Sequence, residues 1–170
     1  MQVPSVATGT QPLVVTTEAG SSKPFNVTVN ATEPGLLAPS SFDLNGTQYV
    51  VALYSDGSTY VLPTGAIAGV TSRPANPGDT ITIYGIGFGP VNEGTPPGEI
   101  AQGQTTLAAP VTVTIGGIPA IVSYAGLGPN YVGLYQFNVM VPSGVSGPSV
   151  PVTFSQGGTA GTQKLYLAVN

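Results

Sequence analysis

Residues 77–90 read PGDTITIYGIGFGP, and this stretch decides the fold. Its first half alternates Ile81 and Ile83 with threonine and tyrosine. A period of two is that of a β-strand with one face in a core. The Gly78-Asp79 pair before it supplies turn chemistry, because glycine adopts a positive φ without steric cost and aspartate can bond its own backbone. We therefore predict a strand that starts at a tight turn.

The second half of the stretch spaces three glycines around Phe88. Similar spacing occurs in dinucleotide-binding loops, but those loops lead directly into a helix whose N-terminus faces the pyrophosphate. Residues 90–98 contain three prolines and two glycines, which oppose a regular helix. The glycines therefore predict a structural corner, with Phe88 in the core.

The same alternation recurs along the chain on both sides of this corner. Before it, residues 48–54 and 59–62 flank an Asp56-Gly57 pair, which is a strong hairpin signal. After it, further strands are expected at 111–115, 118–124, 134–141, 150–154 and 165–169. The predicted core positions are Tyr135, Phe137, Val139, Val141, Val150, Val152, Phe154, Leu165, Leu167 and Val169. No segment predicts a helix, so we expect an all-β immunoglobulin-like β-sandwich of about eight or nine strands.

Two groups of motifs carry a family resemblance. GDTITIYGIGFG at 78–89 and VTVTIGGIPA at 111–120 resemble an immunoglobulin-like domain of the IPT/TIG type. YAGL at 124–127 and VGLYQFNVMVP at 132–142 are similar to the uncharacterised C-terminal domain of large secreted proteins of Solibacter-type bacteria. The resemblance covers about residues 33–170. It implies an immunoglobulin-like fold and an extracellular or cell-surface location, and it carries no assigned activity.

The beginning of the chain repeats the layout of its end. Residues 12–30 and 151–170 each have a strand after proline, a turn of small residues, a lysine, an alternating strand and a final Val-Asn. Such self-similarity predicts tandem modules. We interpret residues 1–32 as the closing hairpin of a preceding module, with its turn at Gly-Ser-Ser 20–22, 33–48 as a connector and 49–170 as the sandwich.

A two-stranded hairpin alone is marginally stable in water, so its apolar side chains need a partner surface. That surface is expected either on the following sandwich or on another chain. The candidate assembly residues of the hairpin are Leu13, Val15, Phe25, Val27 and Val29.

Composition excludes several classes of function. The chain has a net charge of −4 and only three cationic residues, so we expect no nucleic-acid binding. No run approaches the roughly 18 apolar residues of a membrane helix, so no membrane insertion is expected. Cysteine and histidine are absent and the seven acids show no clustered or paired spacing. We therefore expect no cofactor, no metal site and no enzymatic activity.

One long segment is a candidate ligand loop. Residues 89–110 lack periodicity and carry Glu93 and Glu99, while Tyr124 and Tyr131 flank a second loop. Long loops in compact domains are often functional, and exposed tyrosines can stack on sugars. The alternative is a surface cross-over, with tyrosines half-buried at strand ends.

The sequence as a whole favours a non-catalytic structural or assembly module. Its expected partners are other modules of the same protein or other copies of itself, joined by strand addition. The alternative is a carbohydrate-binding or adhesive module with polysaccharide as its partner.

Overall fold

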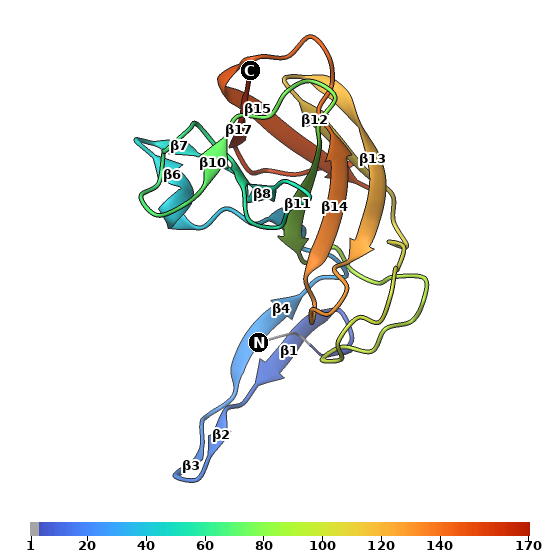
Figure 1. The fold of residues 1–170 in the computed structure, drawn as a ribbon. Coiled ribbons are helices and arrows are strands. Elements are labelled where there is room, and N and C mark those ends of the chain that lie inside the picture. The colour runs from blue at the N-terminus through green and yellow to red at the C-terminus, as the bar shows by residue number, and fades with distance from the viewer. Residues whose placement is uncertain (1–3) are drawn as a thin grey trace.

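The computed structural model describes residues 4–170 and is almost entirely β, as the sequence predicts. The first layer of the sandwich is centred on β11 (Thr80–Ile86), which pairs with β14 (Tyr135–Met140) on one side. On its other side lie the short strands β5 (Gly35–Leu36) and β8 (Ala52–Leu53). Figure 1 shows these strands facing the second layer across the core.

The long strand β13 (Ile118–Leu127) belongs to both layers. Its second half pairs with β14, and its first half pairs with β12 (Val111–Ile115). The second layer continues through β15 (Gly147–Gln156) to β17 (Leu165–Val169). The change of partner falls between Ala120 and Ile121, and a bulge between Val122 and Tyr124 follows it within the pairing with β14.

The remaining elements are short. The N-terminal hairpin consists of β1 (Gly9–Leu13), β2 (Thr16–Thr17), β3 (Gly20–Ser21) and β4 (Phe25–Val29). The others are η1 (Ser40–Phe42), β6 (Asp43–Leu44), β7 (Thr47–Gln48), β9 (Tyr60–Val61), β10 (Ser72–Arg73) and β16 (Thr159–Ala160). Counted in this way, the described residues contain more strands than the eight or nine expected, because many are two residues long.

Burial follows the predicted alternation closely. Ile81 and Ile83 are buried, while Thr80, Thr82 and Tyr84 are not. All ten predicted core positions on β14, β15, β17 and at Val141 are buried. Phe88 is fully buried, with its ring centroid 4.7 Å from that of Phe137 and 5.5 Å from that of Phe154. The prediction of a core phenylalanine at the glycine corner is therefore confirmed.

The corner also receives the chain that arrives from the hairpin. A Cβ on Gly85 would lie 2.6 Å from Cε2 of Phe88 and 2.8 Å from the carbonyl oxygen of Gly35, so only glycine fits between the ring and β5. Two residues later, Gly87 has a φ of +78° and accepts a 2.9 Å hydrogen bond from the backbone N–H of Glu33.

Several local expectations are wrong. The hairpin turn lies at residues 18–19, and Gly20 and Ser21 instead form β3. The loop expected from Ala125 is shorter, because β13 continues to Leu127. A 3₁₀ turn, η1, forms where no helical element was expected.

We predict that Phe88→Ala lowers the free energy of unfolding by about 3–5 kcal/mol, because it leaves a cavity among packed aromatic rings. Urea unfolding followed by circular dichroism measures the change. Phe25→Ala is the matched control: that ring is 69% exposed, so the same substitution should change the unfolding free energy by less than about 0.5 kcal/mol. Equal losses in the two variants would contradict this assignment of the core.

Candidate functional site

The N-terminal hairpin, residues 9–29, forms an arm that extends away from the sandwich (Figure 1). Its register sets Leu13 opposite Phe25 and Gln11 opposite Val27. Because directly opposite residues share a face of a β-ribbon, the apolar side chains at 13, 25, 27 and 29 line one face of the arm. The opposite face carries mainly threonine, asparagine and proline.

The apolar face of the arm is uncovered in the single chain. Phe25 is 69% exposed, Val15 57% and Leu13 40%, while Val27 and Val29, nearer the base, are half-buried. Among the described residues, neither hydrophobic cluster of the sandwich includes a residue of the arm. The arm thus does not pack on its own sandwich, which was one of the two arrangements expected. Val14 is also exposed and was not singled out by the alternation.

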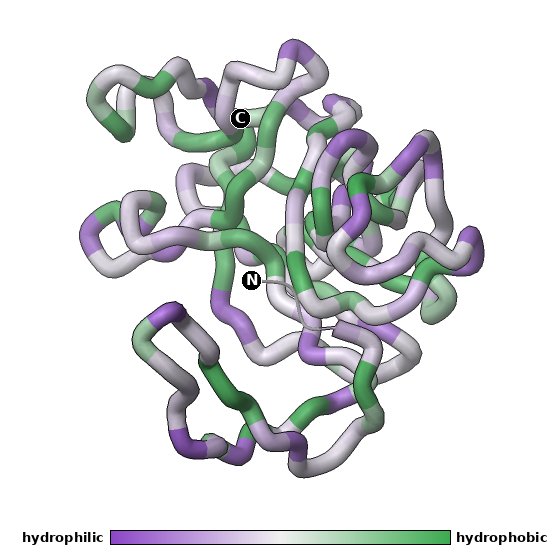
Figure 2. The backbone as a smooth tube through the Cα atoms, turned by 90° about the horizontal axis from the view of Figure 1, so that it is seen from below, coloured by the Kyte–Doolittle hydropathy of each residue, from purple (hydrophilic) through white to green (hydrophobic). Residues whose placement is uncertain are grey.

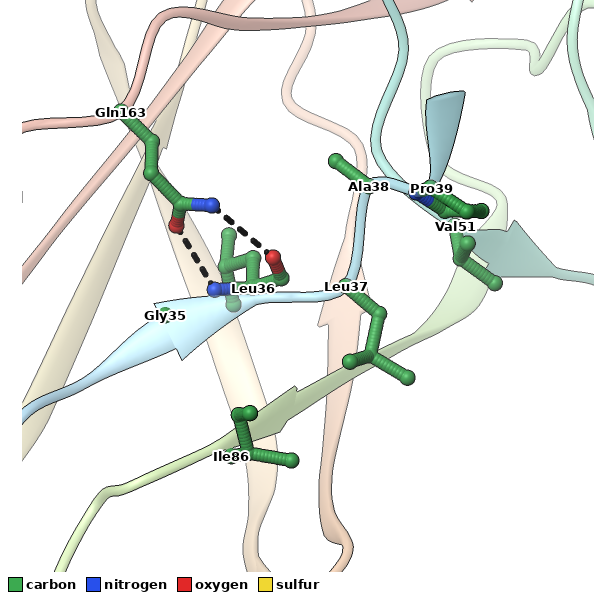
Figure 3. Close-up of a pocket in the computed structure, with 8 residues that line it drawn as sticks. All are labelled: Gly35, Leu36, Leu37, Ala38, Pro39, Val51, Ile86 and Gln163. Carbon is green, nitrogen blue, oxygen red and sulfur yellow. Dashed lines mark hydrogen bonds between the residues drawn. The ribbon is translucent and has the colours of Figure 1, made fainter. Parts of the chain in front are cut away.

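A second feature lies at the sheet edge formed by β5. The side-chain amide of Gln163 accepts a 2.7 Å hydrogen bond from the backbone N–H of Leu36 and donates a 3.0 Å bond to the carbonyl oxygen of the same residue (Figure 3). Gln163 comes from the segment between β16 and β17, so its side chain links the edge of the first layer to the second.

A groove of about 430 Å³ lies beside this edge. Ile86 is 54% exposed at its margin (Figure 3). It is opposite Gly35 in the register, so by alternation it shares a face of the sheet with Leu37. None of the lining residues is charged. They are Gly35, Leu36, Leu37, Ala38, Pro39, Val51, Ile86 and Gln163.

The candidate ligand loop is held against the sheet more firmly than expected. The backbone of Ala101 donates to the carbonyl of Tyr131 and accepts from the N–H of Asn130, each at 3.0 Å, so the two loops do lie together. Ala101, Thr105 and Leu107 are buried. This part of the loop is therefore anchored by a few buried residues, while most of residues 92–104 lie on the surface.

The four candidate ligand residues have different environments. Tyr124 Oη donates to the carbonyl of Leu127 at 2.7 Å and accepts from the N–H of Thr105 at 3.2 Å. These bonds hold the long loop against the end of β13. Glu93 accepts a 2.7 Å bond from the N–H of Thr106, and this bond lowers the pKa of its carboxyl. Glu99 lies in an exposed turn.

Tyr131, the fourth candidate, is 55% exposed. Its ring flanks Gly128 together with Gln136, because a Cβ on that glycine would lie 3.5 Å from Tyr131 Cδ2 and 3.8 Å from Gln136 Cβ. Gln136 in turn is directly opposite Tyr84 in the sheet. Burial raises the pKa of Tyr84, and the nearby Tyr131 phenol raises it further.

Tyr131, Gln136 and Tyr84 form a row on the outer face of the sheet, and further amide and hydroxyl groups continue it. Asn138 Oδ1 accepts hydrogen bonds from Thr82 at 3.2 Å and from Gln136 at 2.9 Å. Alternation along the predicted strand 134–141 puts Gln136 and Asn138 on the face opposite the core positions, but it does not connect them with Tyr131. That connection depends on strand register, which the sequence does not display.

The rest of the described chain offers little ionic chemistry. Within residues 4–170, no group of three or more acidic, histidine or cysteine side chains could hold a metal ion. No helix in the described part is long and apolar enough to cross a membrane. Figure 2 shows hydrophobic and weakly polar segments along most of the backbone, with hydrophilic residues in short scattered stretches.

Comparisons of the chain with models of protein families, with curated proteins and with solved structures found no match.

We predict that Glu93→Gln increases hydrogen exchange at the Thr106 amide several-fold at neutral pH, because a neutral acceptor binds an N–H more weakly than a carboxylate does. The folded-state pKa of the Glu93 carboxyl is lowered, so the stabilisation that the carboxylate gives to the folded state is complete at neutral pH. It is lost as the pH falls through that lowered pKa. Exchange measured by NMR tests this. Glu99→Gln is the control and should leave the Thr106 amide unchanged; equal effects of the two would contradict the assigned contact.

Proposed function

We propose that this chain is a non-catalytic structural module of a secreted or cell-surface protein, and that it associates with other copies of itself through its N-terminal arm. The observation that carries the proposal is the exposure of Leu13, Val15 and Phe25 on an arm that contributes no residue to the sandwich core. The extracellular location is supported by the family resemblance of residues 33–170.

The arm offers both kinds of contact that strand addition uses. Its apolar side chains can be buried, and the outer edges of β1 and β4 can pair with a further strand. Fully burying a Leu, Val or Phe side chain contributes about 1.5–3 kcal/mol. These side chains are already partly covered, so burying three of them stabilises the complex by roughly 3–5 kcal/mol. The entropy lost on association opposes this gain. This gain does not by itself exceed the association entropy, so the backbone hydrogen bonds of an added strand, about 0.5–1.5 kcal/mol each, must supply the difference. We therefore expect only weak association of free chains, at high micromolar concentration or above.

The low charge of the chain favours close contact between copies. Charged residues make up only 6% of the sequence, and the strands β1 and β4 contain none. Bringing two such surfaces together therefore removes few charges from water, which is the costly part of burying a polar interface. Mutual repulsion at a net charge of −4 is also small at physiological salt.

The test is the molar mass of the full chain over a concentration series, measured by sedimentation equilibrium. We expect a concentration-dependent increase for the wild type and its loss in a Leu13→Thr/Phe25→Thr variant, because threonine keeps β-propensity and removes the apolar area. Asn26→Thr, on the opposite face of β4, is the control and should associate normally. A wild-type chain that stays monomeric up to about 1 mM, where weak pairs would form, would contradict the proposal.

A second candidate function is carbohydrate binding at the outer face of β11 and β14. The observation that favours it is the uncharged row of Tyr84, Gln136, Asn138 and the exposed Tyr131. Aromatic rings can stack on the apolar faces of sugar rings, and amides can pair with their hydroxyl groups. An uncharged face of this kind suits a neutral polysaccharide.

Affinity electrophoresis of the full chain in gels containing a soluble β-glucan or a xylan tests this second candidate. We expect retardation by at least one of the two, a loss of about fivefold or more in affinity for Tyr131→Ala, and little change for Tyr131→Phe, which keeps the stacking ring. Migration unaffected by both polysaccharides, or equal retardation of the alanine variant, would contradict it.

A further inference from the structure

We infer that the edge of β5, with the groove beside it, is the acceptor site for the arm of a second copy of this chain. The inference rests on the proposed self-association and adds its second half, namely the surface on which the arm docks. It is carried by three observations: the way Gln163 caps the edge, the apolar groove beside it, and the direction of the arm.

Gln163 occupies the position that a neighbouring strand would take. In an antiparallel pair, one residue exchanges both its N–H and its C=O with the residue opposite. A primary amide presents one acceptor and one donor in the same arrangement, and Gln163 uses both on Leu36. The backbone groups of Leu36 at the edge of β5 are therefore paired only with one half-buried side chain and not with a strand. A strand that arrives there can replace both hydrogen bonds of the glutamine.

The groove next to this edge matches the apolar face of the arm. Leu37, Val51 and Ile86 provide an uncharged surface, of which Ile86 is 54% exposed. The arm strand β4 carries Phe25 and Val27 on one face and has no charged residue. When β4 pairs along the edge, alternate side chains fall on the groove side, where Phe25 covers Ile86 and Leu37. The docked pair therefore buries apolar surface on both partners without burying a charge.

The arm that docks must come from another copy. Just after β4, Thr32 packs against the corner, where a Cβ on Gly89 would lie 2.7 Å from its Cγ2. The backbone N–H of Glu33 is bound to the carbonyl of Gly87 at 2.9 Å. These contacts fix the base of the arm and direct it away from the sandwich (Figure 1). An arm folded back onto its own β5 would have to break them.

This geometry predicts a directional assembly. The arm and the acceptor are different surfaces, so a copy that docks its arm still has a free acceptor, and its partner still has a free arm. Such heterologous contacts build rings where the rotation closes and filaments where it does not. A symmetric dimer that uses the arms alone is not expected.

The first experiment is a matched pair of charge substitutions in the full chain. Ile86 lies at the end of β11, next to β5, and is 54% exposed. Ile121 lies on β13 in the same layer and is 64% exposed, but β14 and β11 lie between that strand and β5. We expect Ile86→Lys to weaken association at least about tenfold, because docking would bury the ammonium group, and Ile121→Lys to associate as the wild type does. Normal association of Ile86→Lys, or equal weakening in both variants, would overturn the inference.

The second experiment maps the contact directly, and the absence of native cysteine makes it clean. Chains carrying Asn26→Cys are mixed with chains carrying Gln163→Cys and treated with a short bis-maleimide. We expect a covalent heterodimer, and little product when Ile121→Cys replaces the second variant. Equal yields with the two partners, or no heterodimer with Gln163→Cys, would overturn the assignment of the acceptor.

The two experiments separate this inference from the proposed function. If the wild-type chain does not associate, the proposed function itself fails. If it associates through Leu13 and Phe25 but neither Ile86→Lys nor the cross-link responds as expected, the arm is the assembly element and the acceptor lies elsewhere.

Discussion

The close packing of Phe88 on Gly85 is the constraint on which the rest of the structure depends. The ring needs a position without a Cβ, and the same position lets β5 approach β11. Gln156, from the second layer, donates a 2.6 Å hydrogen bond to the carbonyl of Phe88, so the corner also joins the two layers. Because the chain from the arm is bonded to this corner at Gly87, the same packing sets the direction in which the arm leaves the sandwich.

Two stretches of edge in the first layer, at β13 and at β5, are both covered by hydrogen bonds, but the covers differ in extent. At β13, the N–H of Leu127 donates to Thr105 Oγ1 at 2.7 Å and the N–H of Leu107 donates to the carbonyl of Ala125 at 3.0 Å. Thr105 is only 3% exposed, so the long loop behaves as a built-in edge strand. At β5 the cover is one half-buried glutamine side chain. Of the two edges, β5 is the one that a strand can reach with the smaller rearrangement.

Local alternation explains how much of the fold the sequence could predict. Strands of five or more residues in the sandwich were recognised because several inward positions repeat, as at Phe137 and Val139. Two-residue strands such as β5 have no period to detect. The cap on Leu36 joins residues 127 positions apart, and the row of Tyr131 and Gln136 depends on register. The apolar positions of the arm were visible, whereas its separation from the sandwich follows from tertiary contacts at its base.

Because the chain has few charged residues, the side chains and loops that cover its strand edges are important in preventing pairing with other chains. Soluble β-proteins commonly protect edges with lysine or with inward-pointing charges, which penalise pairing with another chain. This chain has only three cations, and none lies on β1, β4 or β5. At these three strands, edge protection must therefore come from hydrogen-bonding side chains and from loops, whereas the outermost strand β10 carries Arg73. The loop closes the edge at β13 and a single glutamine side chain covers the edge at β5. The arm has no cover, so its edges and its apolar face stay open together. The ribbon of β1 and β4 has neither a charged residue nor a cover, which is the arrangement expected of a ribbon that pairs with another chain, as we propose.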